Sequence, residues 1–377
     1  MTFPILNQTM HRSEKYLAIL IIVLFAGTLL AGCVFAPQAV VVPHIDVSTD
    51  NSAPINVTNT FLFESSKITI SLPVDAAVCQ AAKSTSTSVT VYGNVTDKVW
   101  ITDSYMEMIN DPAQEQMYTD LITQFRKIKN DMGLSSDEYL ELMATYIQSL
   151  PYQSRPGEVA KFPVETVVDG TGNCADKSLL LAGLLSREGY KVAIFTFTPE
   201  NHMALGVGSP DTLYKDTGYA YLESTNLSYV GIPPAELEGG IELTSEPMVV
   251  PVGNGTTEYT SGAETAYLNN TATVSNQKAI SLETQDNALV PDLTAKQGQI
   301  SEIQSRMNAM LGRGNIPGYN AEVSSQNSLV ASYNAELAQY NRQVALDKSY
   351  ANVYNYIISH VYDRKGTYAW VKANMPE

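Results

Sequence analysis

The fold is decided by residues 169–223, which read DGTGNCADKSLLLAGLLSREGYKVAIFTFTPENHMALGVGSPDTLYKDTGYAYLE. A Gly-rich turn at 170–173 leads to Cys174, and the eleven residues after it are helix formers without proline. This pattern predicts a helix that begins at Cys174 and ends near Gly189. Three β-strands are predicted after the helix, from the runs at 192–197, 202–207 and 219–223. The expected fold class is therefore α+β.

Three side chains in this stretch have the types and the order of a nucleophilic site. A thiol at a helix N-terminus lies near unpaired N–H groups and the positive end of the helix dipole, which favour the thiolate. His202 begins one predicted strand and Glu223 ends the next, so neighbouring antiparallel strands can bring both to Cys174. In such a site Cys174 is the nucleophile, His202 the general base and Glu223 the acid that orients the imidazole.

Each of these residues also has an ordinary interpretation. A lone cysteine at a helix start is usually an inert small residue, a lone histidine is usually structural, and an acid at a strand end is usually solvated. A disulfide between Cys79 and Cys174 would abolish the nucleophile in an oxidising compartment. Two cysteines make no disulfide framework, and the order Cys, His, acid on one helix and two strands favours the catalytic interpretation.

At this point the chain resembles the transglutaminase-like superfamily, whose catalytic domain has a papain-like fold. The resemblance covers about residues 135–235, and its motifs are at 162–176, 179–185, 188–193, 201–207, 221–225 and 230–234. It implies an α+β core with Cys174 at a helix N-terminus and with His202 and Glu223 on antiparallel strands. It also implies that the segment 147–152 approaches the oxyanion, where Tyr152 or Gln148 would serve. It implies no cofactor.

Two features depart from the family pattern. The acid is Glu223 where animal transglutaminases have Asp, which resembles the microbial branch of the family. His202 is followed by Met-Ala and not by Ala-Trp, and this leaves the substrate class open.

The N-terminal segment 1–33 is expected to direct export and not to join the fold. A short basic flank precedes an uncharged apolar run at 16–32, a length between a signal peptide and a spanning helix. The run ends in Leu-Ala-Gly-Cys33, which resembles a lipoprotein signal with Cys33 as the lipid-attachment residue. The alternative is an uncleaved membrane anchor. In both cases the chain is tethered to the cell membrane and faces the exterior, because the basic flank stays inside.

Composition excludes some partners. The net charge is −16, from 39 acidic against 23 basic residues, so no basic surface is available for nucleic acid. The four histidines lie at positions 11, 44, 202 and 360, without the spacing of metal ligands, so no metal site is expected.

The rest of the chain divides into five further segments. We expect a linker at 34–58, a small β-rich appendage at 59–100, the catalytic domain at 101–236, a Gly/Ser/Thr/Asn-rich linker with short strands at 237–291, and a helical region at 292–377. Within the catalytic domain, Ser135-x-x-Glu138 predicts a helix start with a capping box. Residues 292–348 predict an antiparallel helical hairpin, from an apolar heptad rhythm on both sides of a Gly/Pro turn. The hairpin is either a spacer or a surface for a protein partner, or it packs on the catalytic domain.

The predicted function is an exported, membrane-tethered cysteine hydrolase that cleaves peptide or amide bonds through a Cys174 thioester. The first alternative is transfer of the acyl group to an amine, which cross-links proteins. The second is a non-catalytic module of the same fold that binds peptides or assembles the envelope.

Overall fold

Helix α7 (Cys174–Arg187) runs through the middle of the body of the protein in the computed structural model, which describes residues 39–48, 52–155, 159–237 and 239–376. Its leucines at 179–181, 184 and 185 are all fully buried. A helix that is apolar on every side has to be surrounded, and α7 contacts helices on one side and the main sheet on the other.

The main sheet has the strand order β7-β6-β5-β8, and all its pairs are antiparallel. Its strands are β5 (Val192–Phe197), β6 (His202–Val207), β7 (Ala220–Leu222) and β8 (Met248–Val252). The three strands expected after the central helix are thereby confirmed. Every residue of β6 and β7 is buried, which explains their continuous apolar sequence.

The helices around α7 come from the segment that precedes it. They are α3 (Asp97–Asn110), the short 3-10 helix η1 (Pro112–Gln114), α4 (Glu115–Met132), α5 (Ser136–Ser149) and α6 (Pro163–Asp169). The capping box predicted at the start of α5 is present, since Ser135 and Glu138 each bond the other's backbone N–H.

The N-terminal part of the described chain is better integrated than the sequence suggested. Residues 34–58 were expected to be a linker, but β1 (Ala39–Val41) and the start of β2 (Ile55–Phe63) lie there. β1 pairs with β4 (Thr90–Tyr92), and β2 pairs with β3 (Ser66–Val74), which is followed by helix α2 (Ala76–Ser84). The alternating apolar residues of β2 and β3 face α4 and α5 and join the main core, so tertiary burial overrides the linker-like composition.

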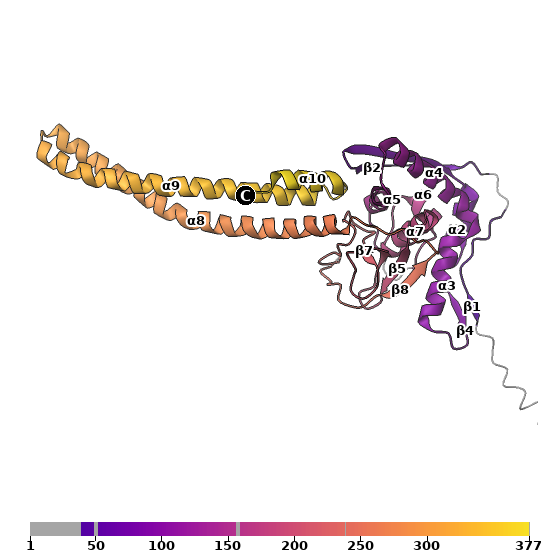
Figure 1. The fold of residues 1–377 in the computed structure, drawn as a ribbon. Helices are drawn as coiled ribbons and strands as arrows, with labels where there is room; N and C mark the ends of the chain where they lie inside the picture. The colour runs from indigo at the N-terminus through magenta and orange to yellow at the C-terminus, as the bar shows by residue number, and fades with distance from the viewer. Residues whose placement is uncertain (1–38, 49–51, 156–158, 238, 377) are drawn as a thin grey trace, which may run out of the picture.

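The C-terminal region forms a long helical hairpin that extends away from the body (Figure 1). It consists of α8 (Gly262–Gly312) and α9 (Ile316–Ser359), and α10 (Arg364–Asn374) lies back along its base. At 1.5 Å per residue, α9 alone is about 65 Å long. The predicted antiparallel hairpin is thus confirmed, with Leu293, Ile303 and Met307 of α8 buried in its seam.

The linker expected at 237–291 is wrong in its second half, because α8 begins at Gly262 and passes through Pro291. Its Ser, Thr and Asn residues have low helix propensity, but tertiary packing stabilises the helix in spite of them. Thr265 and Leu268 are fully buried at the base of the hairpin, and the later turns lie against α9.

None of the helices in the described ranges combines the length and the apolar character needed to span a bilayer. The predicted export segment 1–33 and its Cys33 lie outside the described residues.

Candidate active site

The turn before α7 fixes the position of Cys174. Gly170 ends α6 in the left-handed conformation, with φ of 64°. A side chain at Gly172 would meet the Cβ of Asp176 at 2.9 Å, so only glycine fits there. Asn173 then caps the helix, because its side chain accepts from the backbone N–H of Asp176 at 3.0 Å. Cys174 is consequently the first residue of the helix, where the free N–H groups of the first turn lie.

The structure brings His202 and Glu223 together from neighbouring strands. His202 Nε2 lies 3.5 Å from Glu223 Oε2. The hydroxyl of Tyr221 donates to the same carboxylate oxygen at 2.8 Å and lies 3.2 Å from His202 Nε2. The imidazole is therefore joined to the carboxylate both directly and through the tyrosine oxygen. Nε2 faces this pair, and Cys174 lines the same cleft as the ring.

His202 and Glu223 each shift the pKa of the other in the direction that favours its charged form. Burial by itself lowers the pKa of His202, but the neighbouring Cys174 thiol and Glu223 carboxylate raise it to about 9. Burial raises the pKa of Glu223, but bonds from His202 and Thr225 outweigh it and lower the pKa to about 2. At neutral pH the two groups thus form an imidazolium–carboxylate pair.

The other oxygen of Glu223 is held by the chain that follows it. Oε1 accepts from the backbone N–H of Ser224 at 2.9 Å and of Thr225 at 2.8 Å, and from the Thr225 hydroxyl at 2.7 Å. These bonds fix the carboxylate plane before any substrate binds, which is what an orienting acid requires.

Tyr221 and Lys177 are two site residues that the sequence analysis did not single out. Tyr221 and Glu223 are two positions apart, so they project from the same face of an extended segment, and this spacing was the available signal. Lys177, one turn after Cys174, is fully buried and donates to the carbonyls of Gln148, Leu150 and Thr225. Burial lowers its pKa to about 8. Nothing in the local sequence distinguishes this lysine from an exposed one.

The two residues expected near the oxyanion differ in their surroundings. Gln148 is buried, and its side-chain amide donates to the carbonyl of Glu223 at 2.8 Å and to that of Ser228 at 3.2 Å. Because both of its N–H groups are used, Gln148 positions the Glu223 segment and has no donor left for a substrate. Tyr152 is 40% exposed, pairs its backbone with Gly172 and lines a cavity together with Cys174.

A cleft runs past the thiol on both sides. One cavity, of about 590 Å³, lies under α3 and β4, and we call it the α3 pocket. The other, of about 1090 Å³, lies between residues 225–237 and 239–241 on one side and the base of α8 on the other, and we call it the loop pocket. Cys174, Asn201 and His202 line both cavities, so these three residues lie where the two cavities meet.

Both cysteines in the described part of the chain are free thiols. Cys79 is buried in α2, and burial raises its pKa. Cys174 is partly exposed in the cleft. The disulfide that would have removed the nucleophile is absent between these two residues.

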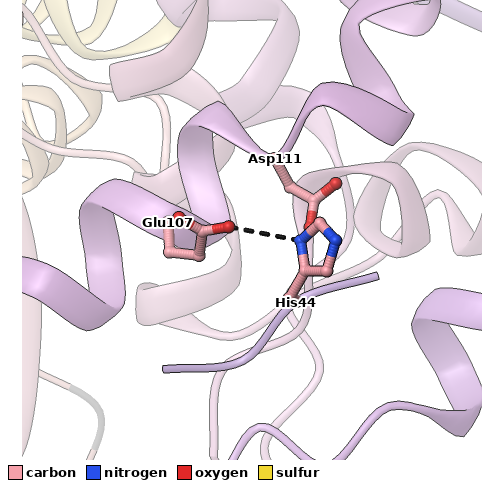
Figure 2. A group of neighbouring side chains, drawn as sticks. All are labelled: His44, Glu107 and Asp111. Atoms are coloured by element: carbon pink, nitrogen blue, oxygen red, sulfur yellow. Dashed lines mark ion pairs between the residues drawn. The ribbon is translucent and has the colours of Figure 1, made fainter. Parts of the chain in front are cut away.

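A second group of polar side chains lies at the C-terminal end of α3. Figure 2 shows the ring of His44 beside the carboxylates of Glu107 and Asp111. His44 Nδ1 is 3.3 Å from Glu107 Oε1 and 2.9 Å from Asp111 Oδ2, and the three ligand-type atoms lie within 4.8 Å of one another. These residue types can hold a divalent cation, and the grouping could not be predicted because His44 is distant from the other two along the chain. Asp111 also accepts from the N–H of Ile45 at 2.7 Å, so the group fastens the N-terminal segment to α3.

Comparison with known proteins returns nothing: no family model matches the chain, and neither the curated proteins nor the solved structures contain a match. The assignment of a function therefore depends on the geometry of the site.

Proposed function

We propose that the protein is a transglutaminase-like cysteine hydrolase that cleaves peptide or amide bonds through a thioester on Cys174. The observation that supports it most strongly is a partly exposed thiol at a helix N-terminus, in a cleft that it shares with a buried histidine that lies 3.5 Å from a buried carboxylate. The papain-like core implied by the family resemblance has this arrangement of helix and antiparallel strands.

The chemistry proceeds in two halves. The Cys174 thiolate, paired with the His202 imidazolium, adds to the substrate carbonyl. The imidazolium then gives its proton to the leaving amine as the C–N bond breaks. The acyl group is then a thioester on the sulfur. A water molecule adds to this carbonyl while the now neutral His202 takes one of its protons. Collapse of the adduct breaks the C–S bond, which releases the carboxylic acid and restores the Cys174 thiolate beside the imidazolium. Glu223 stays ionised throughout and stabilises the imidazolium.

The negative oxygen that develops on the carbonyl needs donors. The N–H groups of the first turn of α7 point toward the cleft end of the helix, where the helix dipole also favours negative charge. The hydroxyl of Tyr152 is a further candidate, because this residue and Cys174 line the same cavity.

We also propose that the protein acts at the exterior face of the cell membrane, tethered by lipid on Cys33 or by an uncleaved N-terminal anchor. Support comes from the sequence of residues 1–33 alone. Its partners would be a peptide or protein substrate and the membrane.

Trapping of the acyl-enzyme tests the catalytic proposal. The protein is incubated with an N-blocked peptide p-nitrophenyl ester, quenched in acid and analysed by mass spectrometry of its peptides. We expect the acyl mass on the peptide that contains Cys174, a burst of nitrophenol, and neither result in Cys174→Ala. Acylation of Cys79 at the same rate, or no acylation, would contradict the proposal.

Acyl transfer to an amine is a second candidate, and the loop pocket favours it. Glu200, Glu223 and Glu236 line this pocket, and no lysine or arginine does so among the described residues. Bonds from Ser245 and Thr244 lower the pKa of Glu200 to about 2, so its charge persists. An alkylammonium group would be attracted there. Adding cadaverine to the ester assay distinguishes the two reactions, since transfer gives the amide product and hydrolysis gives only the acid.

A peptide-binding module without catalysis is the remaining alternative. It predicts that Cys174→Ala binds peptides as tightly as the unsubstituted chain and that no acyl-enzyme forms.

A further inference from the structure

The two pockets that flank Cys174 differ in chemistry. The loop pocket carries the three carboxylates described above. The α3 pocket is lined by apolar and uncharged side chains, and apart from His202 it has no ionisable group other than the Cys174 thiol and one tyrosine among the described residues. Because one pocket is acidic and the other is uncharged and mostly apolar, the two pockets favour different chemical groups of a substrate.

The apolar lining comes from several elements that packing holds in place. Trp100, Tyr105 and Met108 project from α3, Val91 comes from β4, and Phe197 ends β5. Met108 and Phe197 are almost fully buried, so the floor is part of the core. Trp100 is anchored by a bond from its indole N–H to Asp97 at 3.0 Å. The wall is therefore formed before a ligand enters.

The α3 pocket is large enough to hold a whole side chain of a bound peptide. Its volume of about 590 Å³ is within the range of ligand-binding pockets, roughly 300–1,000 Å³. Because its floor continues to Cys174 and His202, whatever occupies it lies next to the reacting carbonyl.

We propose that the α3 pocket is the specificity subsite, and that it takes a large apolar side chain, aromatic or branched, of the acyl-donating peptide. This inference rests on the proposed function and adds the substrate class to it. A charged side chain would lose its hydration in this pocket without gaining a partner, so it is rejected.

Alkylation rates with matched probes test the subsite. The probes are N-acetyl dipeptidyl chloromethyl ketones of two series, Xaa-Gly and Gly-Xaa, with Phe, Leu, Gly or Lys as Xaa. We expect Phe and Leu to alkylate Cys174 about 10- to 100-fold faster than Gly or Lys in one of the two series, as expected for burial of one large apolar side chain. Equal rates for all four residues in both series would overturn the proposal.

Two exposed valines supply a matched pair of variants. Val91 is 37% exposed and lines the pocket, whereas Val99 is 46% exposed on α3 and does not. Val91→Asp should lose most of the preference for Phe and react faster with the Lys probe. Val99→Asp should keep the original order. The rate of each probe is divided by the rate of iodoacetamide, which is too small to need the pocket, on the same variant, so that a change in the reactivity of the thiol itself is corrected for.

Failure of the subsite can be separated from failure of the enzyme. If iodoacetamide alkylates Cys174 no faster than an ordinary thiol, the catalytic proposal is wrong. Binding of a ligand in the α3 pocket is then measured by tryptophan fluorescence. The chain has two tryptophans, so Cys174→Ala with Trp370→Phe leaves Trp100 in the pocket as the single reporter. N-acetyl-phenylalanine amide should change its emission at concentrations where N-acetyl-lysine amide does not. If the two amides have the same effect, the subsite proposal is wrong whatever the fate of the catalytic one.

Discussion

At the scale of single residues, folding changes the acid–base chemistry of His202 and Glu223 in opposite directions. The pKa of His202 rises from 6.5 to about 9, and that of Glu223 falls from 4.5 to about 2. The stabilisation linked to His202 is complete below pH 6.5 and is lost as the pH rises through 9. That linked to Glu223 is present above pH 4.5 and is lost as the pH falls through 2. The pair therefore stabilises the fold most between about pH 4.5 and 6.5.

We predict that His202→Gln destabilises the protein in a pH-dependent way. The difference in free energy of unfolding from the unsubstituted chain should be on the order of 3 kcal/mol larger at pH 5.5 than at pH 9.5. Urea unfolding of both proteins at the two pH values measures it. Taking the difference between the two proteins cancels titrating groups that do not interact with His202, among them Lys177. A difference that does not change with pH would contradict the ion pair.

Glu223→Gln should reduce ester hydrolysis by roughly 10²- to 10⁴-fold, because the amide cannot stabilise the imidazolium. It should also move the alkaline limb of the pH–rate profile down from about pH 9, since Glu223 raises the pKa of His202. Steady-state rates between pH 5 and 10 measure both effects. Glu200→Gln is the matched control, because Glu200 lines the same cleft but bonds to Thr244 and Ser245. An equal loss in the two variants would mean that negative charge in the cleft, and not the orienting bond, matters.

Residue types and their order predicted a site of Cys174, His202 and Glu223. The structure pairs His202 with Glu223 and puts Cys174 in the same cleft as His202. Each stands at the end of an element whose apolar pattern is strong, so its place on the sheet or helix follows from the pattern. The spacing of Tyr221 and Glu223 places both on one face of an extended segment. The role of Lys177 depends on which carbonyls the folded chain brings to it, and local sequence carries no such information.

At the scale of elements, a group of charges around the buried Arg364 fastens the helical hairpin to the body. Arg364 at the start of α10 pairs with Glu141 of α5 and with Glu264 of α8. Tyr259, just before α8, donates to the same Glu141 carboxylate at 2.6 Å. Burial raises the pKa of Glu141 to about 7 even with these partners.

We predict that Arg364→Met lowers the free energy of unfolding by about 3–5 kcal/mol at pH 8, because Glu141 is left as a buried charge without its partner. Removing the guanidinium raises the pKa of Glu141 further. The loss should therefore be smaller at pH 5, where the carboxyl is neutral in both proteins.

Urea unfolding at pH 5 and pH 8 compares the two proteins. Arg313→Met is the control, since Arg313 lies at the exposed tip of α8, and we expect it to change stability by less than about 0.5 kcal/mol. A loss at Arg364 that is larger at pH 5 than at pH 8 would contradict this assignment.

Elements were predictable where the apolar pattern is strong and local. β5, β6 and the capped start of α5 lie where the sequence placed them. The first part of α8 was missed because its Ser, Thr and Asn residues are poor helix formers, and its stability comes from contacts with α9 and the body.

At the scale of the whole molecule, a compact body carries a long hairpin whose base alone reaches the cleft. Asn269 and Thr273 in the first turns of α8 line the loop pocket, and the rest of the hairpin extends away from it (Figure 1). α8 and α9 contact each other along the hairpin, and Lys296 of α8 pairs with Glu336 of α9. Most of the hairpin therefore lies away from the site.

We predict that shortening the hairpin leaves the site intact. In this variant residues 297–335 are replaced by the natural turn 311–317, which keeps the Lys296–Glu336 pair as the last contact. Helical circular dichroism should fall, whereas the alkylation rate of Cys174 should stay within about twofold. A tenfold change in that rate would show that the distal hairpin acts on the cleft.

The most direct measurement is the pH dependence of alkylation of Cys174, with Cys79 in the same molecule as the internal reference. Iodoacetamide labelling followed by mass spectrometry gives both rates between pH 5 and 10. We predict that Cys174 reacts at least tenfold faster than Cys79 at neutral pH, and that His202→Ala removes most of this advantage. Equal, slow labelling of the two thiols, unchanged by His202→Ala, would contradict the catalytic account.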